Sequence, residues 1–305
     1  MPYGRSVQHR PRRRAFAAAV TPLSADATAV DLAAIDELVT FYVASGLDGL
    51  LILGTTGEGV LLSVEERRAV AQRYIAASAG RIAVIVHCGA QSTRDTVELA
   101  CHAAQLGAAG VAVIAPPYFA LDDVALEHHF VAAADACDPT PFYIYEFAAR
   151  SGYAVPLGVV ESVREHCLNL AGLKVSDSPF EKVEPYLIPG LEVYIGAEAL
   201  IHDGLTHGAA GAVSGLAAAL PELTIRAVRS GSAEDSAAAA RVRVAIQRSP
   251  FHAALKRVLR ARGVRVESAV RAPLRDLDTD EAQELAALFV TELTPALIRE
   301  SPFRG

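Results

Sequence analysis

A lysine inside an apolar stretch is the residue with the clearest chemical potential. Lys174 stands between Leu173 and Val175, in a run that predicts a buried strand. Burial of an ammonium group is costly, because a low-dielectric environment disfavours the charged form of lysine. A lysine made neutral in this way attacks carbonyl carbons and forms a Schiff base. The structural alternative is a lysine whose head reaches water or pairs with a carboxylate such as Asp177.

A short segment of glycines and threonines follows another apolar run, with the sequence Gly54-Thr55-Thr56-Gly57-Glu58. The two glycines allow a sharp turn, and the amides and hydroxyls of such a turn converge on one small anion. The carboxylate of an α-keto acid suits a nest of this kind. Such segments are also ordinary strand-to-helix turns, so the loop alone does not establish a binding site.

Tyr145 and Arg150 follow a further apolar run, and each has two interpretations. Tyr145 is either a core aromatic whose hydroxyl finds a partner or a proton shuttle beside the lysine. Arg150 is either an exposed loop residue or a residue whose guanidinium binds a carboxylate through two parallel hydrogen bonds. The fold decides between these alternatives, because it determines which side chains meet.

Eight short apolar runs, each followed by a helical pattern, predict eight strand–helix units. The runs are Phe16–Val20, Gly49–Leu53, Ile82–Val86, Val111–Ala115, Phe142–Tyr145, Ala171–Val175, Glu192–Ile195 and Ala212–Ser214. Several are almost continuously apolar, as in parallel strands covered on both sides. This order predicts an α/β fold of the (β/α)₈ TIM-barrel type. A doubly wound sheet is the alternative, but no G-x-G-x-x-G segment follows the first run.

We expect a disordered basic tail over residues 1–14, the barrel over 15–230 and a C-terminal helical extension over 231–305. Helix starts are indicated by Asp31, by a capping box from Ser63 to Glu66, and by Pro179 at a first helical turn. Catalytic side chains of such barrels stand at the C-terminal ends of the strands. Lys174 and Tyr145 end neighbouring strands, so we expect them at the same mouth. After residue 220 the expected helices are Leu223–Val228, Ser236–Ile246, Phe251–Arg262 and Glu281–Leu293.

Composition narrows the function classes. The chain has 305 residues, of which 52% are hydrophobic, but no apolar stretch is long enough to span a membrane. The formal charge of −7 disfavours a nucleic-acid surface, which needs a basic patch. Four cysteines without a C-x-x-C pair predict reduced thiols and a cytoplasmic location. Cys88 lies near the expected site and is interpreted as a small packing residue rather than a nucleophile.

Together these residues resemble the dihydrodipicolinate synthase / N-acetylneuraminate lyase family of class I aldolases. The resemblance extends from Thr21-Pro22 to the segment Arg271–Leu274. Its most specific elements are the Gly54–Glu58 loop, Tyr145 and the triplet Gly172-Leu173-Lys174. The resemblance implies a lyase that forms an imine between Lys174 and pyruvate or another α-keto acid, joining pyruvate to an aldehyde or releasing it. It implies no metal and no organic cofactor.

The family also implies roles for individual residues. Tyr145 would move protons, and Thr55 would hydrogen-bond to it and pass protons towards Tyr118. The residue matching Tyr118 comes from the adjacent subunit, which implies a homodimer or homotetramer. The resemblance implies that Arg150 holds the carboxylate of aspartate semialdehyde. It implies substrate binding for four further positions, namely Gly54, Thr56, Gly196 and Val213.

Three departures from the family pattern bear on the acceptor pocket. Glu146 stands beside Tyr145 where the family has asparagine, and its charge is expected to disfavour a carboxylated aldehyde unless Arg150 offsets it. Pro117 replaces a second tyrosine, and His87-Cys88-Gly89 replaces a smaller triplet.

Several functions are therefore open. The first is dihydrodipicolinate synthase activity, and its nearest alternative is an aldolase or dehydratase of 2-keto-3-deoxy sugar acids. A non-catalytic ligand-binding barrel has no need for the proton relay. A metal-dependent hydrolase using His87, His202 and His207 is disfavoured, because a spacing of five residues does not place two histidines on one helical face.

Overall fold

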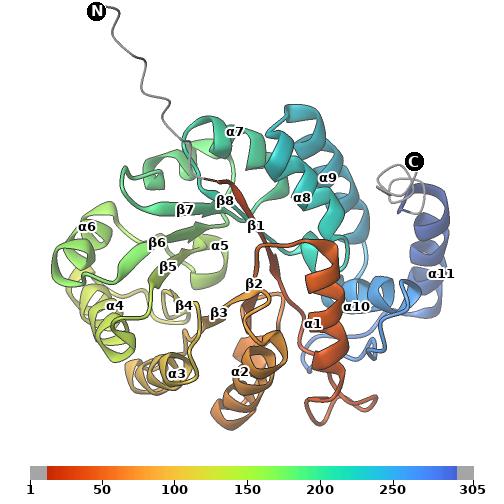
Figure 1. Ribbon diagram of the computed structural model, residues 1–305, viewed down its shortest axis with the longest axis horizontal. Coiled ribbons are helices and arrows are strands. Elements are labelled where there is room, and N and C mark those ends of the chain that lie inside the picture. Colours follow the sequence, from red (N-terminus) through yellow and green to blue (C-terminus); the bar gives the residue numbers. More distant parts are fainter. Residues whose placement is uncertain (1–11, 294–305) are drawn as a thin grey trace, which may run out of the picture.

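Eight parallel strands close into a barrel in which each strand pairs with the next and β8 pairs with β1 (Figure 1). The computed structural model describes residues 12–293. The TIM-barrel prediction is confirmed, and each strand lies within about two residues of its predicted run. The strands are β1 Arg14–Ala18, β2 Gly49–Ile52, β3 Ala83–His87, β4 Gly110–Ile114, β5 Phe142–Glu146, β6 Leu170–Val175, β7 Glu192–Ile195 and β8 Gly211–Ser214.

The strands are apolar on both faces because each face packs against a different set of side chains. The outward face contributes to one large core with the surrounding helices. The inward face forms a separate cluster that fills the barrel, made of Phe16, Ala18, Leu51, Ile85, Ala112, Tyr143, Tyr194 and Val213. Gly49 is required beside this cluster, since a Cβ there would lie 2.0 Å from the Phe16 ring.

The helices of the barrel form the outer ring in Figure 1. The predicted capping box of α2 is present, with Ser63 and Glu66 bonding each other's backbone amides. The helices are α1 Ala34–Ser45, α2 Val64–Ser78, α3 Thr93–Gln105, α4 Asp123–Cys137, α5 Ala148–Ser151, α6 Leu157–His166, α7 Ile201–Thr206 and α8 Pro221–Ser230.

The segment after β6 differs from its prediction. Pro179 was expected to open a helix, but it precedes two short 3₁₀ turns, Phe180–Lys182 and Glu184–Tyr186. Pro185 explains the difference, because a proline inside an α-helix removes a backbone hydrogen bond and clashes with the preceding turn. No α-helix therefore separates β6 from β7.

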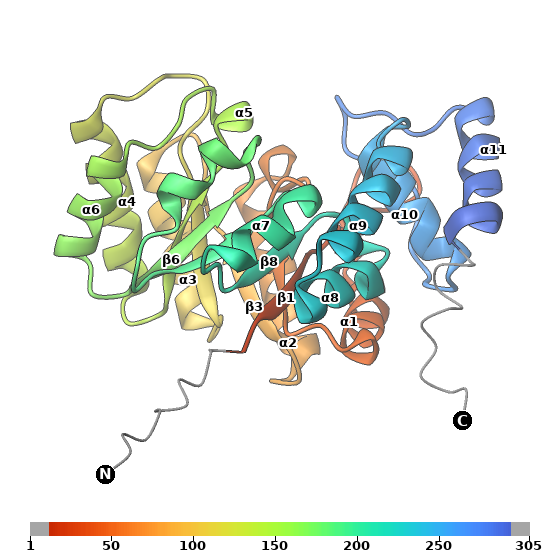
Figure 2. The same cartoon turned by 90° about the horizontal axis from the view of Figure 1, so that it is seen from above.

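Between residues 231 and 293, the C-terminal extension contains three α-helices, namely α9 Ala233–Ile246, α10 Phe251–Ala261 and α11 Thr279–Leu288, and α11 continues as a π turn over Phe289–Leu293. Seen from above, α10 and α11 stand at one side of the barrel, with α11 outermost (Figure 2). Among residues 12–293, no helix is long and apolar enough to cross a membrane.

The first strand begins at Arg14, the last residue of the expected tail. Arg14 is the first residue of β1, where it pairs in register with Gly211 and forms an ion pair with Glu192. Arg12 also forms an ion pair, with Asp48 at 3.0 Å. The rest of the expected tail, residues 1–11, lies outside the described residues.

Candidate active site

Lys174 and Tyr145 lie side by side at the mouth of the barrel. They are in register on β6 and β5, and Lys174 is also in register with the inward-facing Tyr194. The Lys174 nitrogen stands 3.7 Å from the centre of the Tyr145 ring. Lys174 is 7% exposed and Tyr145 is 1% exposed. The structure thus brings the predicted nucleophile and the predicted proton shuttle into contact.

The Tyr145 hydroxyl belongs to a polar network at this mouth. It lies 3.2 Å from the Thr55 hydroxyl, as the sequence predicts. Burial raises the pKa of the Tyr145 phenol, but the Lys174 charge and hydrogen bonds with Lys174, Thr55 and Ser176 outweigh burial and leave that pKa below its usual value. A phenol with a lowered pKa exchanges protons more readily near neutral pH.

The Gly54–Glu58 loop presents free amides beside this network. The loop closes on itself through hydrogen bonds from Glu58 N to Thr55 O and from Gly59 N to Gly54 O. Within residues 12–293, the structure gives no hydrogen bond to the amides of residues 54–57. Buried amides without partners are rare, and four in succession could receive an anion, so we call Gly54–Glu58 the candidate nest. Thr56 is 8% exposed and belongs to this nest.

Residues of the C-terminal extension hold the loop from behind. Lys256 of α10 donates a hydrogen bond of 2.6 Å to the Glu58 carboxylate, and both side chains are fully buried. The Arg271 amide donates to the other Glu58 oxygen at 2.7 Å. His252 Nε2 lies 3.0 Å from the Thr55 carbonyl. Two of these contacts therefore hold the Glu58 carboxylate, and the third holds the backbone carbonyl of Thr55.

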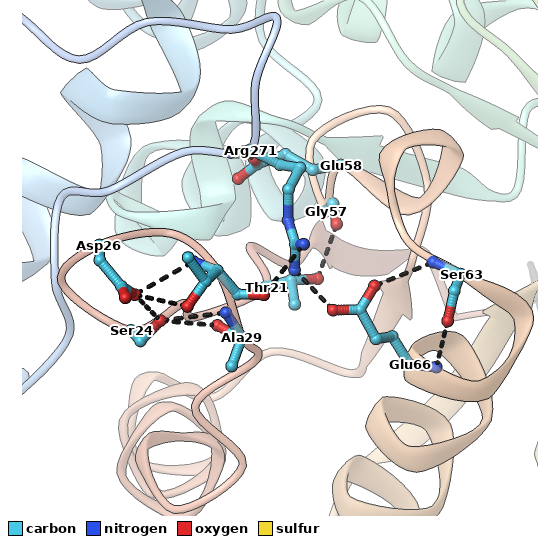
Figure 3. Close-up of polar contacts among 10 residues, drawn as sticks. Thr21, Ser24, Asp26, Ala29, Gly57, Glu58, Ser63, Glu66 and Arg271 are labelled. Atoms are coloured by element: carbon cyan, nitrogen blue, oxygen red, sulfur yellow. Dashed lines mark hydrogen bonds and ion pairs between the residues drawn. The ribbon is translucent and has the colours of Figure 1, made fainter.

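The Arg271 side chain ties this arrangement to the neighbouring loops (Figure 3). Its guanidinium donates to Glu66 at 2.6 Å and to the Thr28 carbonyl at 3.2 Å. Thr21 donates to the Gly57 carbonyl at 2.6 Å. The loops after β1 and β2 are thus bound together beneath the nest.

A cavity of about 550 Å³ opens beside the network. Its wall includes Thr55, His87, Tyr145, Arg150 and His252, whereas Lys174 itself lies outside this wall. The cavity therefore reaches the lysine through Thr55 and Tyr145. Its size is within the range of pockets for small ligands.

Arg150 lies on this wall, as its predicted role requires. It is carried by α5, its side chain is exposed, and its guanidinium carbon lies 5.7 Å from the centre of the Phe147 ring. Gly196 directly follows β7 and Val213 lies within β8, on the other side of Lys174. A Cβ on Gly196 would lie 2.0 Å from Ser176 Oγ, so only glycine fits there.

Glu146 does not face the cavity whose wall includes Tyr145. Successive residues of a strand point to opposite faces, so Glu146 points away from the mouth that Tyr145 faces. Its carboxylate accepts a hydrogen bond of 2.9 Å from Val155 N, and it is not part of the cavity wall. Burial, together with the neighbouring Asp177 carboxylate, raises the pKa of Glu146 to about 8. Glu146 is therefore largely protonated at neutral pH and contributes little negative charge.

Tyr118 does not meet Thr55 within one chain. Its side chain is 87% exposed, its backbone has a φ of +86°, and its ring packs on Phe119. The predicted relay from Thr55 to Tyr118 is thus not formed inside a single subunit.

The histidines proposed as metal ligands bind separate backbone carbonyls. Each ring contacts a different backbone carbonyl oxygen through its Nδ1 atom, at 3.1 Å or less. His87 contacts Leu53, His202 contacts Gly231 and His207 contacts Asp203. In the described part of the chain, no group of three or more His, Cys, Asp or Glu side chains could hold a metal ion.

His87 and Cys88 both occupy buried positions at the end of β3. Burial, followed by the charges of Arg67 and Lys174, lowers the pKa of His87 to about 3, so its ring is neutral. Burial raises the pKa of the Cys88 thiol to about 12, which agrees with a packing residue.

Three residues that the C-terminal helices bring to this region were not predicted from the sequence, namely Arg243, His252 and Lys256. Lys256 had a detectable signal, because it interrupts the apolar face of a helix whose neighbours Leu255 and Leu259 are buried. Arg243 and His252 had none.

The similarity to known proteins defines the class of protein as a lyase. The model of the Dihydrodipicolinate synthetase family matches residues 11–291, and the chain belongs to this family. It is 33% identical over 281 residues to a 4-hydroxy-tetrahydrodipicolinate synthase of Sorangium cellulosum, covering 89% of this chain and 93% of the relative. An uncharacterized DapA-like lyase of Halobacterium salinarum is 35% identical over 274 residues, with 87% of each chain covered.

Solved structures show the same fold. The N-acetylneuraminate lyase of Proteus mirabilis superimposes with a TM-score of 0.82 at 30% identity, covering 92% of this chain and 98% of that chain. YagE, a family member from E. coli K12 in complex with pyruvate, superimposes with a TM-score of 0.84 at 25% identity, covering 91% and 97%.

Proposed function

We propose that this lyase forms an imine between Lys174 and pyruvate, and then joins pyruvate to an aldehyde or releases it from one. The observation that carries the proposal is the contact between Lys174 and Tyr145 beside four free amides. Names of relatives support it, since they include a 4-hydroxy-tetrahydrodipicolinate synthase and N-acetylneuraminate lyases.

The chemistry follows from the geometry of the side chains. The Gly54–Glu58 nest binds the pyruvate carboxylate and directs the keto carbon to Lys174. The lysine nitrogen attacks that carbon, and loss of water gives an iminium ion that accepts electrons when a methyl proton leaves. The resulting enamine carbon attacks the aldehyde. Tyr145 gives a proton to the new alkoxide, and water then releases the product from Lys174.

Arg150 favours an aldehyde that carries a carboxylate, such as aspartate semialdehyde. The charge of Glu146 no longer opposes this choice, because Glu146 faces away from the pocket and is largely protonated. The sugar-acid branch remains the alternative, and turnover of 2-keto-3-deoxy sugar acids without turnover of aspartate semialdehyde would select it. We further propose a homodimer or homotetramer, in which Tyr118 of the partner subunit completes the relay from Thr55.

Borohydride trapping tests the imine. The sequence has three lysines, Lys174, Lys182 and Lys256, so peptide mass analysis assigns the adduct without ambiguity. With pyruvate and borohydride, we expect the reduced pyruvyl mass on Lys174, and Lys174→Arg should remove it. The exposed Lys182 provides the matched control, because Lys182→Arg should leave the label unchanged. A label on another residue, or none, would refute the proposed function.

A further inference from the structure

His87, the last residue of β3, brings an unused ring nitrogen to the wall of the cavity. Its side chain is buried, at 7% exposed, and its Nδ1 atom lies 3.1 Å from the Leu53 carbonyl oxygen. Because a carbonyl oxygen only accepts hydrogen bonds, Nδ1 carries the ring proton, and Nε2 of the neutral ring is an acceptor. Within the described part of the chain, Nε2 has no hydrogen-bond partner. A buried acceptor without a donor is costly, so a donor supplied by a ligand would satisfy it.

The neighbours of Nε2 belong to the cavity wall. A Cβ on Gly89 would lie 3.0 Å from Nε2 and 3.0 Å from Ile114 Cγ2. His87, Gly89 and Ile114 all line the cavity. Glycine at position 89 therefore adds no side chain between Nε2 and the cavity, and the ligand that meets this nitrogen is one bound in the cavity.

The charges around His87 decide which donor fits. Arg67 is 4% exposed, and its guanidinium donates to the carbonyl oxygens of His87 at 2.8 Å and of Gly89 at 3.1 Å. Burial and the charges of Arg67 and Lys174 keep the ring neutral by lowering the pKa of His87. The same two cations repel a third, so an ammonium group is a poor donor at this place. A hydroxyl group donates without carrying charge and is not opposed.

His87 also stands next to the group that handles the reacting oxygen. Its ring meets the Tyr145 ring edge-on, with the ring centres 5.8 Å apart. In the proposed reaction, Tyr145 gives a proton to the alkoxide formed from the aldehyde. A substituent on the carbon atoms beside the reacting carbonyl therefore lies close to His87.

We propose that His87 is a specificity-determining residue that accepts, through Nε2, a hydrogen bond from a hydroxyl group next to the reacting carbonyl of the second reactant. This inference rests on the proposed function and adds a preference for hydroxylated aldehydes. A methyl group in place of the hydroxyl leaves the buried nitrogen unpaired, and a site of this kind rejects a ligand that lacks the donor.

Pairs of aldehydes with the same number of heavy atoms measure this recognition. Glycolaldehyde and propanal differ by a hydroxyl in place of a methyl group, as do 3-hydroxypropanal and butanal. The quantity measured is kcat/KM for each aldehyde at saturating pyruvate, with the product identified by mass. In at least one pair, we expect the wild type to prefer the hydroxylated aldehyde about tenfold, the range for one hydrogen bond. The aldehydes also differ in intrinsic reactivity, so the change of this ratio between variants decides.

Three substitutions isolate Nε2. His87→Asn removes it but keeps a donor for Leu53, because the amide nitrogen of asparagine takes the position of Nδ1, and the ratio should fall about tenfold. His87→Gln puts an amide oxygen near the former position of Nε2 and should restore part of the ratio. His129→Asn is the matched control, because His129 is also buried with an unpartnered Nε2 but lies on α4, outside the cavity wall. It should keep the wild-type ratio.

Gly89→Ala tests the same contact without changing the histidine. Its methyl group would stand over Nε2, so the ratio should fall here too. An unchanged ratio in His87→Asn or in Gly89→Ala, equal losses with both aldehydes of a pair, or the same change of ratio in His129→Asn would each overturn the inference. So would a wild type that traps pyruvate on Lys174 but uses none of the four aldehydes. Failure of pyruvate trapping in the wild type would instead refute the proposed function.

Discussion

The two sides of Lys174 are built differently. On one side, the Gly54–Glu58 loop is held by the buried contacts of Lys256, His252 and Arg271. On the other side, Tyr118 is 87% exposed and Phe119 is 71% exposed, and Arg150 is exposed on a short helix. We infer that the fixed side binds the keto acid common to every turnover. We propose that the exposed side meets the second reactant and the second subunit.

The largest effect is expected at the lysine–tyrosine pair. Tyr145→Phe should slow enamine formation by about 10²–10⁴-fold, the usual loss for a positioned acid–base group. Proton–deuterium exchange of the pyruvate methyl group, followed by NMR, measures this step without an acceptor.

Tyr143 provides the control on the same strand. Its hydroxyl bonds Glu192 at 3.0 Å near the other end of the barrel, so Tyr143→Phe should change the exchange rate little. Equal losses in the two variants would show that Tyr145 acts only as a core aromatic.

The second prediction tests whether the buried ion pair between Lys256 and Glu58 stabilises the fold. Lys256→Met should lower the free energy of unfolding by about 3–5 kcal/mol, because Glu58 would keep a buried charge with one hydrogen-bond donor fewer. Denaturant unfolding measures the loss. Arg260→Met on the same helix breaks an exposed pair with Glu267 and should cost about 1 kcal/mol or less. If both variants lose the same amount, burial of the Lys256–Glu58 pair does not stabilise the loop.

The smallest effect is expected behind the exposed side, at Glu146. Its pKa is about 8 in the fold against an ordinary value of 4.5, so the folded chain keeps a proton that the unfolded chain releases between these values. The free energy of unfolding should therefore fall as the pH rises from about 5 to 8. Glu146→Gln should remove this part of the decline and stabilise the protein by roughly 1–3 kcal/mol at pH 8. Unfolding curves at pH 5, 6.5 and 8 test it, and an unchanged slope in the variant would contradict the assignment.

Much of the barrel could be predicted because its signals are local. Apolar runs mark the strands, and the Ser63–Glu66 capping box marks a helix start. Lys174 and Tyr145 could be paired because neighbouring parallel strands end at the same mouth. The alternation of side chains along β5 was also available, and applying it would have placed Glu146 away from the pocket.

The contacts of the C-terminal helices could not be predicted in the same way. Glu58 and Lys256 are separated by 198 residues, and the local sequence around either residue does not predict contact with the other. The position of Arg243 depends on how α9 packs at the mouth, and only the assembled fold determines that packing. The helix expected at Pro179 is replaced by 3₁₀ turns for a local reason, because the second proline at position 185 interrupts the segment.

The long separation between Glu58 and its partners has a consequence for the order in which the protein matures. The Arg271 amide that bonds Glu58 comes 213 residues later in the chain, after every strand of the barrel has been synthesised. Chains fold from the N-terminus as they leave the ribosome. The Gly54–Glu58 loop therefore gains these hydrogen bonds only when translation has passed residue 271, and we expect affinity for the keto acid to depend on these contacts and not on closure of the barrel alone.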